Sequence, residues 1–115
     1  MKKIIILIIS VIMLTGCGAA YQTISAVEVK NLIDDGAKII DVRTMEEYNE
    51  GHIASSINIP VDRIEEISYQ KDETIIVYCA SGVRSATAAK ELISLGYNNV
   101  YNLDGGLINW GYGTE

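Results

Sequence analysis

Residues 74–93 read TIIVYCASGVRSATAAKELI, and this stretch indicates the fold. Residues 74–78 form an uninterrupted run of apolar, β-branched and aromatic side chains, which is typical of a strand buried on both faces. A helix is predicted over residues 85–95, and Gly96 is placed to end it. A strand that leads through a short loop into a helix is the repeating unit of a parallel sheet covered by helices.

The remainder of the chain continues this alternation. Ser25 and Thr44 each stand three residues before a glutamate, which is the spacing of a capping box at the start of a helix. Further segments are predicted as strands at 38–42, 56–59 and 99–103 and as a short helix at 62–67. In parallel sheets, ligands bind beyond the carboxyl ends of the strands. Cys79 and Arg43 both fall at such ends.

Cys79 occupies a position that favours a reactive thiol. The helix after the loop directs its N-terminal amides and its macrodipole toward the sulfur, and both lower the pKa of a thiol. A thiolate is a nucleophile, so this arrangement is a candidate for covalent catalysis. The alternative is a buried, inert cysteine at a strand end.

Two arginines are candidates for binding an anion near the thiol. Arg84 contributes either its guanidinium or its backbone amide to such a site. Arg43 either neutralises an incoming anionic donor or pairs with Glu46 or Glu47, and we favour the pairing.

Three other residues are expected to have structural roles, each with a functional alternative. Asp41 is expected to accept backbone amides, with proton transfer as the alternative. His52, the single histidine, is expected to fix its loop, with a general base as the alternative. Trp110 is expected to cover the core, with a place beside the cleft as the alternative.

The N-terminus is predicted to be a lipoprotein signal peptide over residues 1–16. Lys2 and Lys3 precede an apolar run at 4–14, and the string LTGC at 14–17 resembles the bacterial lipobox, whose cysteine is lipidated. We therefore predict lipidation of Cys17, a tether over 17–23 and a single domain over 24–115, held on the extracytoplasmic face of the cell membrane. The alternative is an uncleaved N-terminal anchor helix.

Charge and cysteine usage exclude several classes of function. Removal of residues 1–16 takes away two lysines and no acid, so the net charge of −6 becomes −8. Such a surface is repelled by nucleic acid, so no nucleic-acid partner is expected. With Cys17 lipidated, Cys79 is the one remaining thiol, which excludes an internal disulfide and, with a single histidine, a structural zinc site.

Several motifs together resemble the rhodanese-type sulfurtransferases. In chain order they are DVR at 41–43, EEY at 46–48, GHI at 51–53, INIP at 57–60, the cysteine loop at 79–84 and GGLINW at 105–110. The resemblance implies a three-layer α/β/α sandwich with a five-stranded parallel sheet. The chain departs from the family pattern at Ser55-Ser56 and in the cysteine loop, which has no basic residue next to Cys79.

The resemblance also implies an activity. Cys79 would take a sulfane sulfur from thiosulfate or a persulfide, hold it as a cysteine persulfide and pass it to a thiol or to cyanide. The amides of Ala80, Ser81, Gly82, Val83 and Arg84 would stabilise the anionic sulfur. No metal or organic cofactor is implied, and we expect a monomer.

Two other functions remain open. One is a persulfide- or thiol-binding module that carries sulfur for a membrane partner without turnover. The other is a cysteine phosphatase or arsenate reductase on the same fold. In the superfamily that the resemblance implies, the loops of those enzymes are one residue longer. The loop here has four residues between Cys79 and Arg84, so we disfavour both activities.

Overall fold

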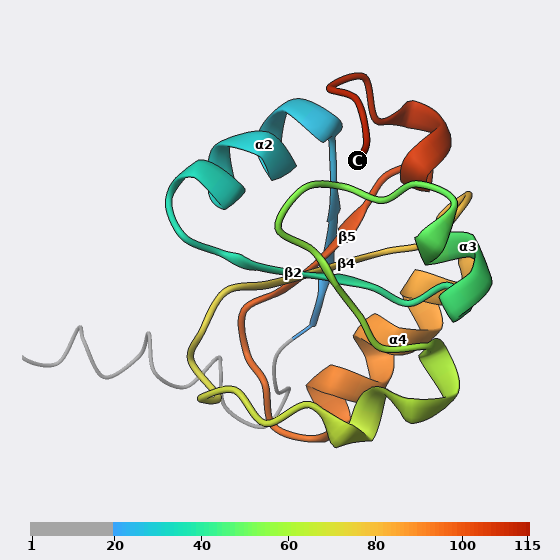
Figure 1. Ribbon diagram of the computed structural model, residues 1–115. Helices are drawn as coiled ribbons and strands as arrows, with labels where there is room; N and C mark the ends of the chain where they lie inside the picture. The colour runs from blue at the N-terminus through green and yellow to red at the C-terminus, as the bar shows by residue number, and fades with distance from the viewer. Residues whose placement is uncertain (1–19) are drawn as a thin grey trace, which may run out of the picture.

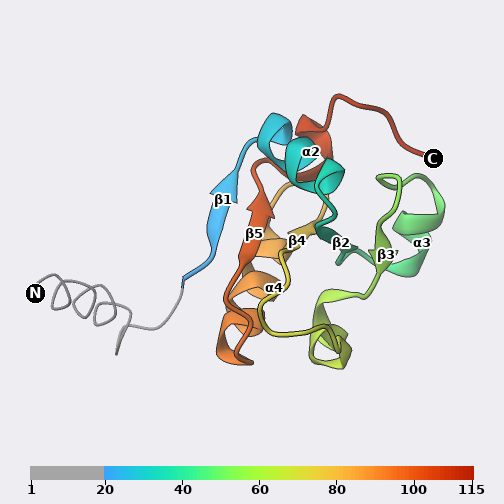
Figure 2. The same ribbon diagram turned by 90° about the vertical axis from the view of Figure 1, so that its left-hand side faces the viewer.

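The sheet at the centre of the protein contains five parallel strands in the order β1-β5-β4-β2-β3. The structure is a computed structural model that describes residues 20–115. The strands are β1 (Gln22–Ile24), β2 (Lys38–Asp41), β3 (Ile57–Asn58), β4 (Ile75–Tyr78) and β5 (Val100–Leu103). Figure 2 shows them side by side across the sheet. The predicted fold class is confirmed.

Helices cover both faces of the sheet (Figure 1). They are α2 (Ala26–Asp34), α3 (Met45–Asn49), α4 (Val83–Ser94) and the 3-10 helices η1 (Val61–Glu66) and η2 (Gly106–Asn109). Both predicted capping boxes are present, because Ser25 and Thr44 each accept the backbone amide of the glutamate three residues later. These local contacts fix where α2 and α3 begin.

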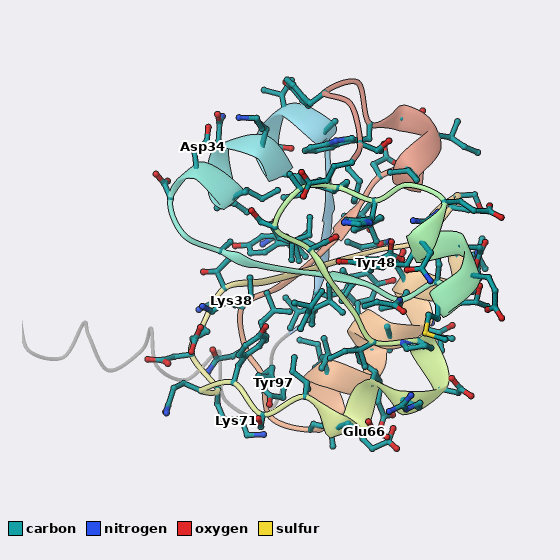
Figure 3. All side chains as sticks on the ribbon, viewed as in Figure 1. Asp34, Lys38, Tyr48, Glu66, Lys71 and Tyr97 are labelled. Carbon is teal, nitrogen blue, oxygen red and sulfur yellow. The ribbon has the colours of Figure 1, made fainter. Side chains whose placement is uncertain are left out.

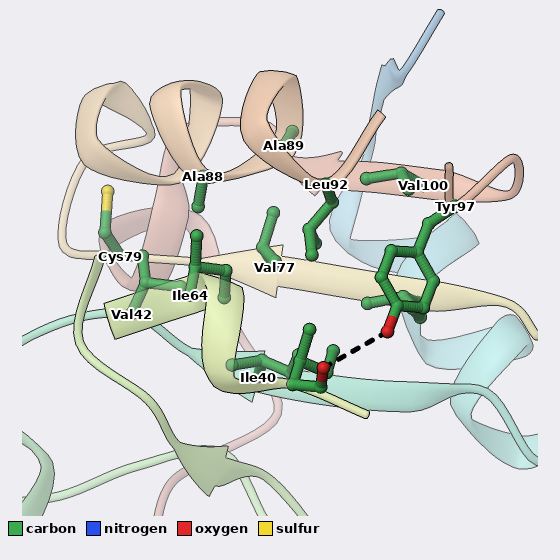
Figure 4. Close-up of a cluster of buried hydrophobic side chains, with 12 residues drawn as sticks. Ile40, Val42, Ile64, Val77, Cys79, Ala88, Ala89, Leu92, Tyr97 and Val100 are labelled. Atoms are coloured by element: carbon green, nitrogen blue, oxygen red, sulfur yellow. Dashed lines mark hydrogen bonds between the residues drawn. The ribbon is translucent and has the colours of Figure 1, made fainter. Parts of the chain in front are cut away.

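Alternate residues of each central strand face opposite layers of the core. Ile75 and Val77 of β4 belong to a cluster with Ala88, Ala89 and Leu92 of α4, which Figure 4 shows. The intervening Ile76 and Tyr78 belong to a second cluster on the side of α2. β4 is therefore buried on both faces, as its unbroken apolar sequence predicts.

The far end of α4 is held by a residue outside the helix. The Lys71 ammonium donates to the Leu95 carbonyl at 3.0 Å and lies 4.0 Å from the centre of the Tyr97 ring (Figure 3). A cation at the C-terminus of a helix interacts favourably with the helix dipole. The sequence motifs did not indicate this contact, because Lys71 and Leu95 are far apart in the chain.

Several predicted boundaries differ from the structure. Residues 22 and 23, predicted as part of a tether, belong to β1, which pairs with β5. The strand predicted at 56–59 is limited to Ile57–Asn58, and the short helix predicted at 62–67 is the 3-10 helix η1. The helix predicted from residue 85 begins two residues earlier, at Val83.

Candidate active site

Cys79 is the first residue after β4, at the carboxyl end of the central strand. Its side chain is 1% exposed, and Figure 4 shows it at the end of the core cluster next to α4. The loop from Cys79 leads directly into α4, as the sequence predicts. The thiol therefore lies at the edge of the sheet where parallel α/β proteins bind their ligands.

Two backbone amides and one hydroxyl surround the sulfur. The amides of Gly82 and Ser85 lie 3.1 and 3.3 Å from Cys79 Sγ, and Ser85 Oγ lies 3.4 Å away. Burial raises the pKa of the Cys79 thiol, but hydrogen bonds from Ser85 and from the loop amides outweigh burial, so the pKa lies below its ordinary value. The site therefore favours the nucleophilic thiolate.

The backbone of the loop supplies further donors. Gly82 adopts a left-handed conformation with φ of 103°, which glycine tolerates without strain, and its amide donates to the sulfur. In the described part of the chain, the amides of Val83 and Arg84, the first two of α4, have no hydrogen-bond acceptor. Such orphan amides at a helix N-terminus can bind an anion. Ala80 and Ser81 complete the loop without contributing a charge.

A double glycine supports the loop from the other side. Leu107 and Ile108 donate their amides to the carbonyls of Cys79 and Ala80 at 2.9 and 3.2 Å. A Cβ at Gly106 would lie 2.5 Å from the Cys79 carbonyl oxygen, so no larger residue fits there without movement. In the sequence, this pair of glycines begins the motif at 105–110. The structure shows that it allows η2 to pack directly on the cysteine loop.

Arg84 uses its guanidinium in an ion pair rather than leaving it free. Its Nη1 and Nη2 atoms lie 2.8 and 3.0 Å from the two carboxylate oxygens of Glu47. The bond from Arg84 and the amide of Thr44 lower the pKa of Glu47 to about 2. Of the two roles considered for Arg84, this geometry favours the backbone amide as the group that faces an anion.

Arg43 is also paired, but not with the partner predicted. Its side chain is buried and binds both carboxylate oxygens of Asp41, with Nη2 2.6 Å from Oδ2, and it also donates to the Gly51 carbonyl at 2.7 Å. The expected pairing with Glu46 or Glu47 is wrong, because Glu47 is bound by Arg84. Asp41 also accepts the Arg43 amide at 2.9 Å, which is the structural role expected of it.

His52 and Trp110 lie in structural positions. The His52 ring stacks on Tyr48 at 3.8 Å, and its Nδ1 lies 2.9 Å from the Tyr48 carbonyl. Trp110 packs against the core cluster on the side of α2, whereas Cys79 belongs to the cluster on the side of α4. His52 thus fixes its loop, and Trp110 covers the core.

Sequence reasoning missed Ser85 and Asn102 as site residues. Ser85 Oγ donates to Asn102 Oδ1 at 2.5 Å, and both side chains are buried behind the sulfur. The available signal for Ser85 was a hydroxyl residue in the first turn of a helix that follows a cysteine loop. Asn102 lies on β5, and nothing near it in the sequence links it to Cys79.

Across residues 20–115, no group of three or more His, Cys, Asp or Glu side chains is arranged to hold a metal ion. Over the same span, no helix combines the length and apolarity needed to cross a bilayer. The predicted signal peptide and Cys17 lie outside the described residues.

Several known proteins are similar to this chain in sequence and fold. Residues 25–112 match the family described as the rhodanese-like domain. The thiosulfate sulfurtransferase GlpE of Coxiella burnetii is 33% identical over 93 residues, which cover 78% of this chain and 87% of that protein. A rhodanese-related protein of Thermoplasma volcanium has a crystal structure that aligns with a TM-score of 0.73 at 35% identity, over 83% of this chain and 98% of that one.

A human protein, the single-domain sulfurtransferase TSTD1, aligns with a TM-score of 0.72 at 28% identity, over 76% of this chain and 93% of that one. Some curated relatives are longer: the chain spans 65% of a mitochondrial protein of Schizosaccharomyces pombe and 27% of a tRNA uridine(34) hydroxylase of Erwinia tasmaniensis. The match over most of the chain, the five-stranded parallel sheet and the cysteine loop lead to one conclusion: the protein belongs to the rhodanese-like domain family.

Proposed function

We propose that the protein is a sulfurtransferase that carries a sulfane sulfur on Cys79. The observation that carries this proposal is the ring of polar groups around Cys79 Sγ, formed by the amides of Gly82 and Ser85, which donate to it, and by the hydroxyl of Ser85, which lies within hydrogen-bond distance. These donors favour a thiolate in the resting protein. Relatives named as thiosulfate sulfurtransferases support the same reaction.

The proposed reaction has two steps. The Cys79 thiolate attacks the outer sulfur of thiosulfate, a sulfur–sulfur bond to Cys79 forms, and the bond to sulfite breaks with its electron pair leaving on sulfite. An acceptor thiolate or cyanide then attacks the outer sulfur and returns the electron pair to Cys79. In the persulfide, the negative charge lies on the outer sulfur, where the unpaired amides of Val83 and Arg84 are available to it. No proton donor is required in either step.

Loop length favours sulfur over phosphate as the bound group. Four residues separate Cys79 from Arg84, and a short loop closes its amides around one additional sulfur atom. A phosphate group needs room and donors for three equatorial oxygens. The Arg84 guanidinium, which could serve a phosphate, is bound to Glu47 on both of its outer nitrogens.

Intact mass spectrometry tests the proposal. We expect wild-type protein to gain one sulfur atom on incubation with thiosulfate or a small persulfide, and to lose it to an added thiol. Cys79→Ala should gain none. Wild-type protein should not hydrolyse an aryl phosphate, whereas insertion of one glycine after Ser81 should weaken sulfur loading. Hydrolysis of the phosphate ester that depends on Cys79, without persulfide formation, would overturn the proposal.

One observation favours a second function, that of a sulfur carrier without useful turnover. The loop offers no unpaired basic side chain to an anionic donor, because Ala80 and Ser81 are uncharged and Arg84 is bound to Glu47. A carrier would receive its sulfur from a partner's persulfide rather than from thiosulfate. Steady-state turnover with several donors separates the two: a carrier loads once from a persulfide and shows no sustained turnover with thiosulfate.

We further propose that Cys17 is lipidated and holds the domain on the extracytoplasmic face of the cell membrane. Support comes from the order of Lys2 and Lys3, the apolar run at 4–14 and the string LTGC at 14–17. A diacyl anchor is sufficient for stable membrane association, and the acidic domain would not associate through charge.

A further inference from the structure

Two buried polar side chains lie behind the reacting sulfur. Ser85 is 0% exposed and Asn102 is 4% exposed. Ser85 Oγ lies between Cys79 Sγ at 3.4 Å and Asn102 Oδ1 at 2.5 Å, and Asn102 Nδ2 lies 3.3 Å from the Gly82 carbonyl. Burying polar groups is costly unless their hydrogen bonds are made, so the arrangement of protons in this cluster is restricted.

The orientation of the Asn102 amide follows from Gly82. A carbonyl oxygen accepts hydrogen bonds, so the NH₂ side of Asn102 faces Gly82 and the Oδ1 side faces Ser85. The Ser85 hydroxyl carries one proton and can donate it either to Asn102 Oδ1 or to Cys79 Sγ. When it donates to Asn102, its lone pairs can accept from a thiol S–H. When it donates to the sulfur, it satisfies a thiolate.

We propose that the Ser85 hydroxyl alternates between Asn102 Oδ1 and Cys79 Sγ as the charge on the sulfur changes, with Ser85 as a catalytic donor and Asn102 as its positioning residue. The proposal rests on the sulfur transfer proposed above. When Cys79 forms its bond to the outer sulfur, Sγ becomes neutral, and the hydroxyl turns to Asn102. When the acceptor removes that sulfur, the electron pair returns to Sγ, and the hydroxyl turns back.

Charged groups on the neighbouring elements do not replace this role. Arg84 of α4 is bound to Glu47 of α3, and Arg43 is bound to Asp41 at the end of β2. Each of these cations is therefore matched by a carboxylate, and neither pair presents a net charge to the sulfur. Ser85 is the one side chain within hydrogen-bond distance of Cys79 Sγ in the described part of the protein.

The alternation makes opposite predictions for the two residues. Ser85→Ala removes a donor from the thiolate, so the apparent pKa of Cys79 should rise. Asn102→Leu removes the acceptor that competes for the hydroxyl, so the apparent pKa should fall. A hydrogen bond to a charged group is strong enough that Ser85→Ala should contain roughly tenfold less thiolate at a pH below the midpoint. Ser85→Thr keeps the hydroxyl and should resemble wild type.

The experiment titrates the full chain by ultraviolet thiolate absorbance. Each variant is compared with the same variant carrying Cys79→Ala, so that the absorbance of Cys17 and of the tyrosines is subtracted. The measurement needs no reagent that must reach the buried sulfur. Unfolding temperatures are measured for every variant. If Asn102→Leu does not fold, Asn102→Ala takes its place with the same expected direction.

A double variant distinguishes the alternation of the Ser85 hydroxyl from a general loosening of the loop. Because Asn102 acts through Ser85, Ser85→Ala with Asn102→Leu should titrate as Ser85→Ala alone. Three results would overturn the proposal: an additive effect in the double variant, an unchanged titration profile for Ser85→Ala, or an apparent pKa of Cys79 that is unchanged or raised in Asn102→Leu. Failure of wild-type protein to accept sulfur from any donor would instead refute the proposed function, and the titrations would still report on the hydroxyl.

Discussion

Gly106 brings the chain after β5 into contact with the backbone of the reactive loop. Its φ of 63° lies in the left-handed region, and an added Cβ would meet the Cys79 carbonyl oxygen at 2.5 Å and atoms of Ala80 at 2.7 Å. Both partners are backbone atoms, so they cannot move aside as a flexible side chain would. The position of the cysteine loop therefore depends on the absence of a side chain at Gly106.

We expect Gly106→Ala to displace the cysteine loop. Overpacking of this kind costs about 1–3 kcal/mol of stability, and misplacement of a reacting atom by about 1 Å lowers a rate by on the order of 100-fold. Sulfur loading by mass spectrometry and thermal unfolding measure the two effects. Gly111→Ala is the matched control, because no atom lies within 4 Å of a Cβ added there. Equal loading rates for the two variants would show that the loop does not depend on Gly106.

The beginnings of α3 and α4 are joined through Glu47. Its carboxylate closes the capping box of α3 by accepting the Thr44 amide at 2.9 Å, and the same group binds Arg84 in the first turn of α4. One side chain therefore contributes to a local cap and to a contact between elements far apart in sequence. The cap sets the position of Glu47, and Glu47 in turn orients Arg84 beside the cysteine loop.

Acid should weaken this contact within a defined range of pH. Arg84 and then the Thr44 amide lower the pKa of Glu47 from 4.5 to about 2, so the stabilisation is complete above pH 4.5 and is lost as the pH falls toward 2. Glu47→Gln should therefore lose less stability than wild type across that range. Because the pair is partly exposed, the difference should be at most about 1 kcal/mol.

Urea unfolding at several pH values measures the effect of Glu47→Gln. Glu46→Gln is the control, because Glu46 lies on the same helix and is exposed. A wild-type curve that runs parallel to the Glu47→Gln curve from pH 6 to pH 2.5 would contradict the ion pair. If the stability curve of Glu46→Gln also diverged from that of wild type, the effect would belong to the charge of α3 as a whole.

As a whole, the protein combines an acidic domain with a basic and apolar N-terminal segment. The full chain has nine basic and fifteen acidic residues, and Lys2 and Lys3 lie in the segment that the proposed cleavage removes. Charge would repel the remaining domain from anionic lipid. Membrane association would therefore depend on acyl chains, each buried CH₂ of which contributes about 0.8 kcal/mol.

We expect Cys17→Ser to release the protein from the membrane fraction or to stop its maturation, because the lipid has no other attachment point in the string LTGC. Fractionation and intact mass of the membrane-bound form check this. Cys79→Ser is the matched control and should remain in the membrane fraction. Persistence of Cys17→Ser in membranes with residues 1–16 still attached would favour an uncleaved anchor helix.

The parts of the protein that depend on near neighbours in the chain could be predicted from the residues alone. Capping boxes at Ser25 and Thr44, the buried strand before Cys79 and the helix after it are set by contacts within a few residues, and each was predicted from spacing and periodicity. The cysteine loop is equally local, because the donors to the sulfur come from residues three and six positions later.

Contacts between distant segments follow from the folded arrangement of the chain and could not be predicted from local patterns. β1 has one buried residue in three and no clear pattern of its own, so its place in the sheet follows from pairing with β5. The partners of Arg43 and Arg84 depended on which carboxylate the fold brought nearest, and Asn102 reaches Ser85 because β5 lies beside β4. Such contacts join residues that are close in space but have no fixed separation in the chain, so neither local propensity nor periodicity can predict them.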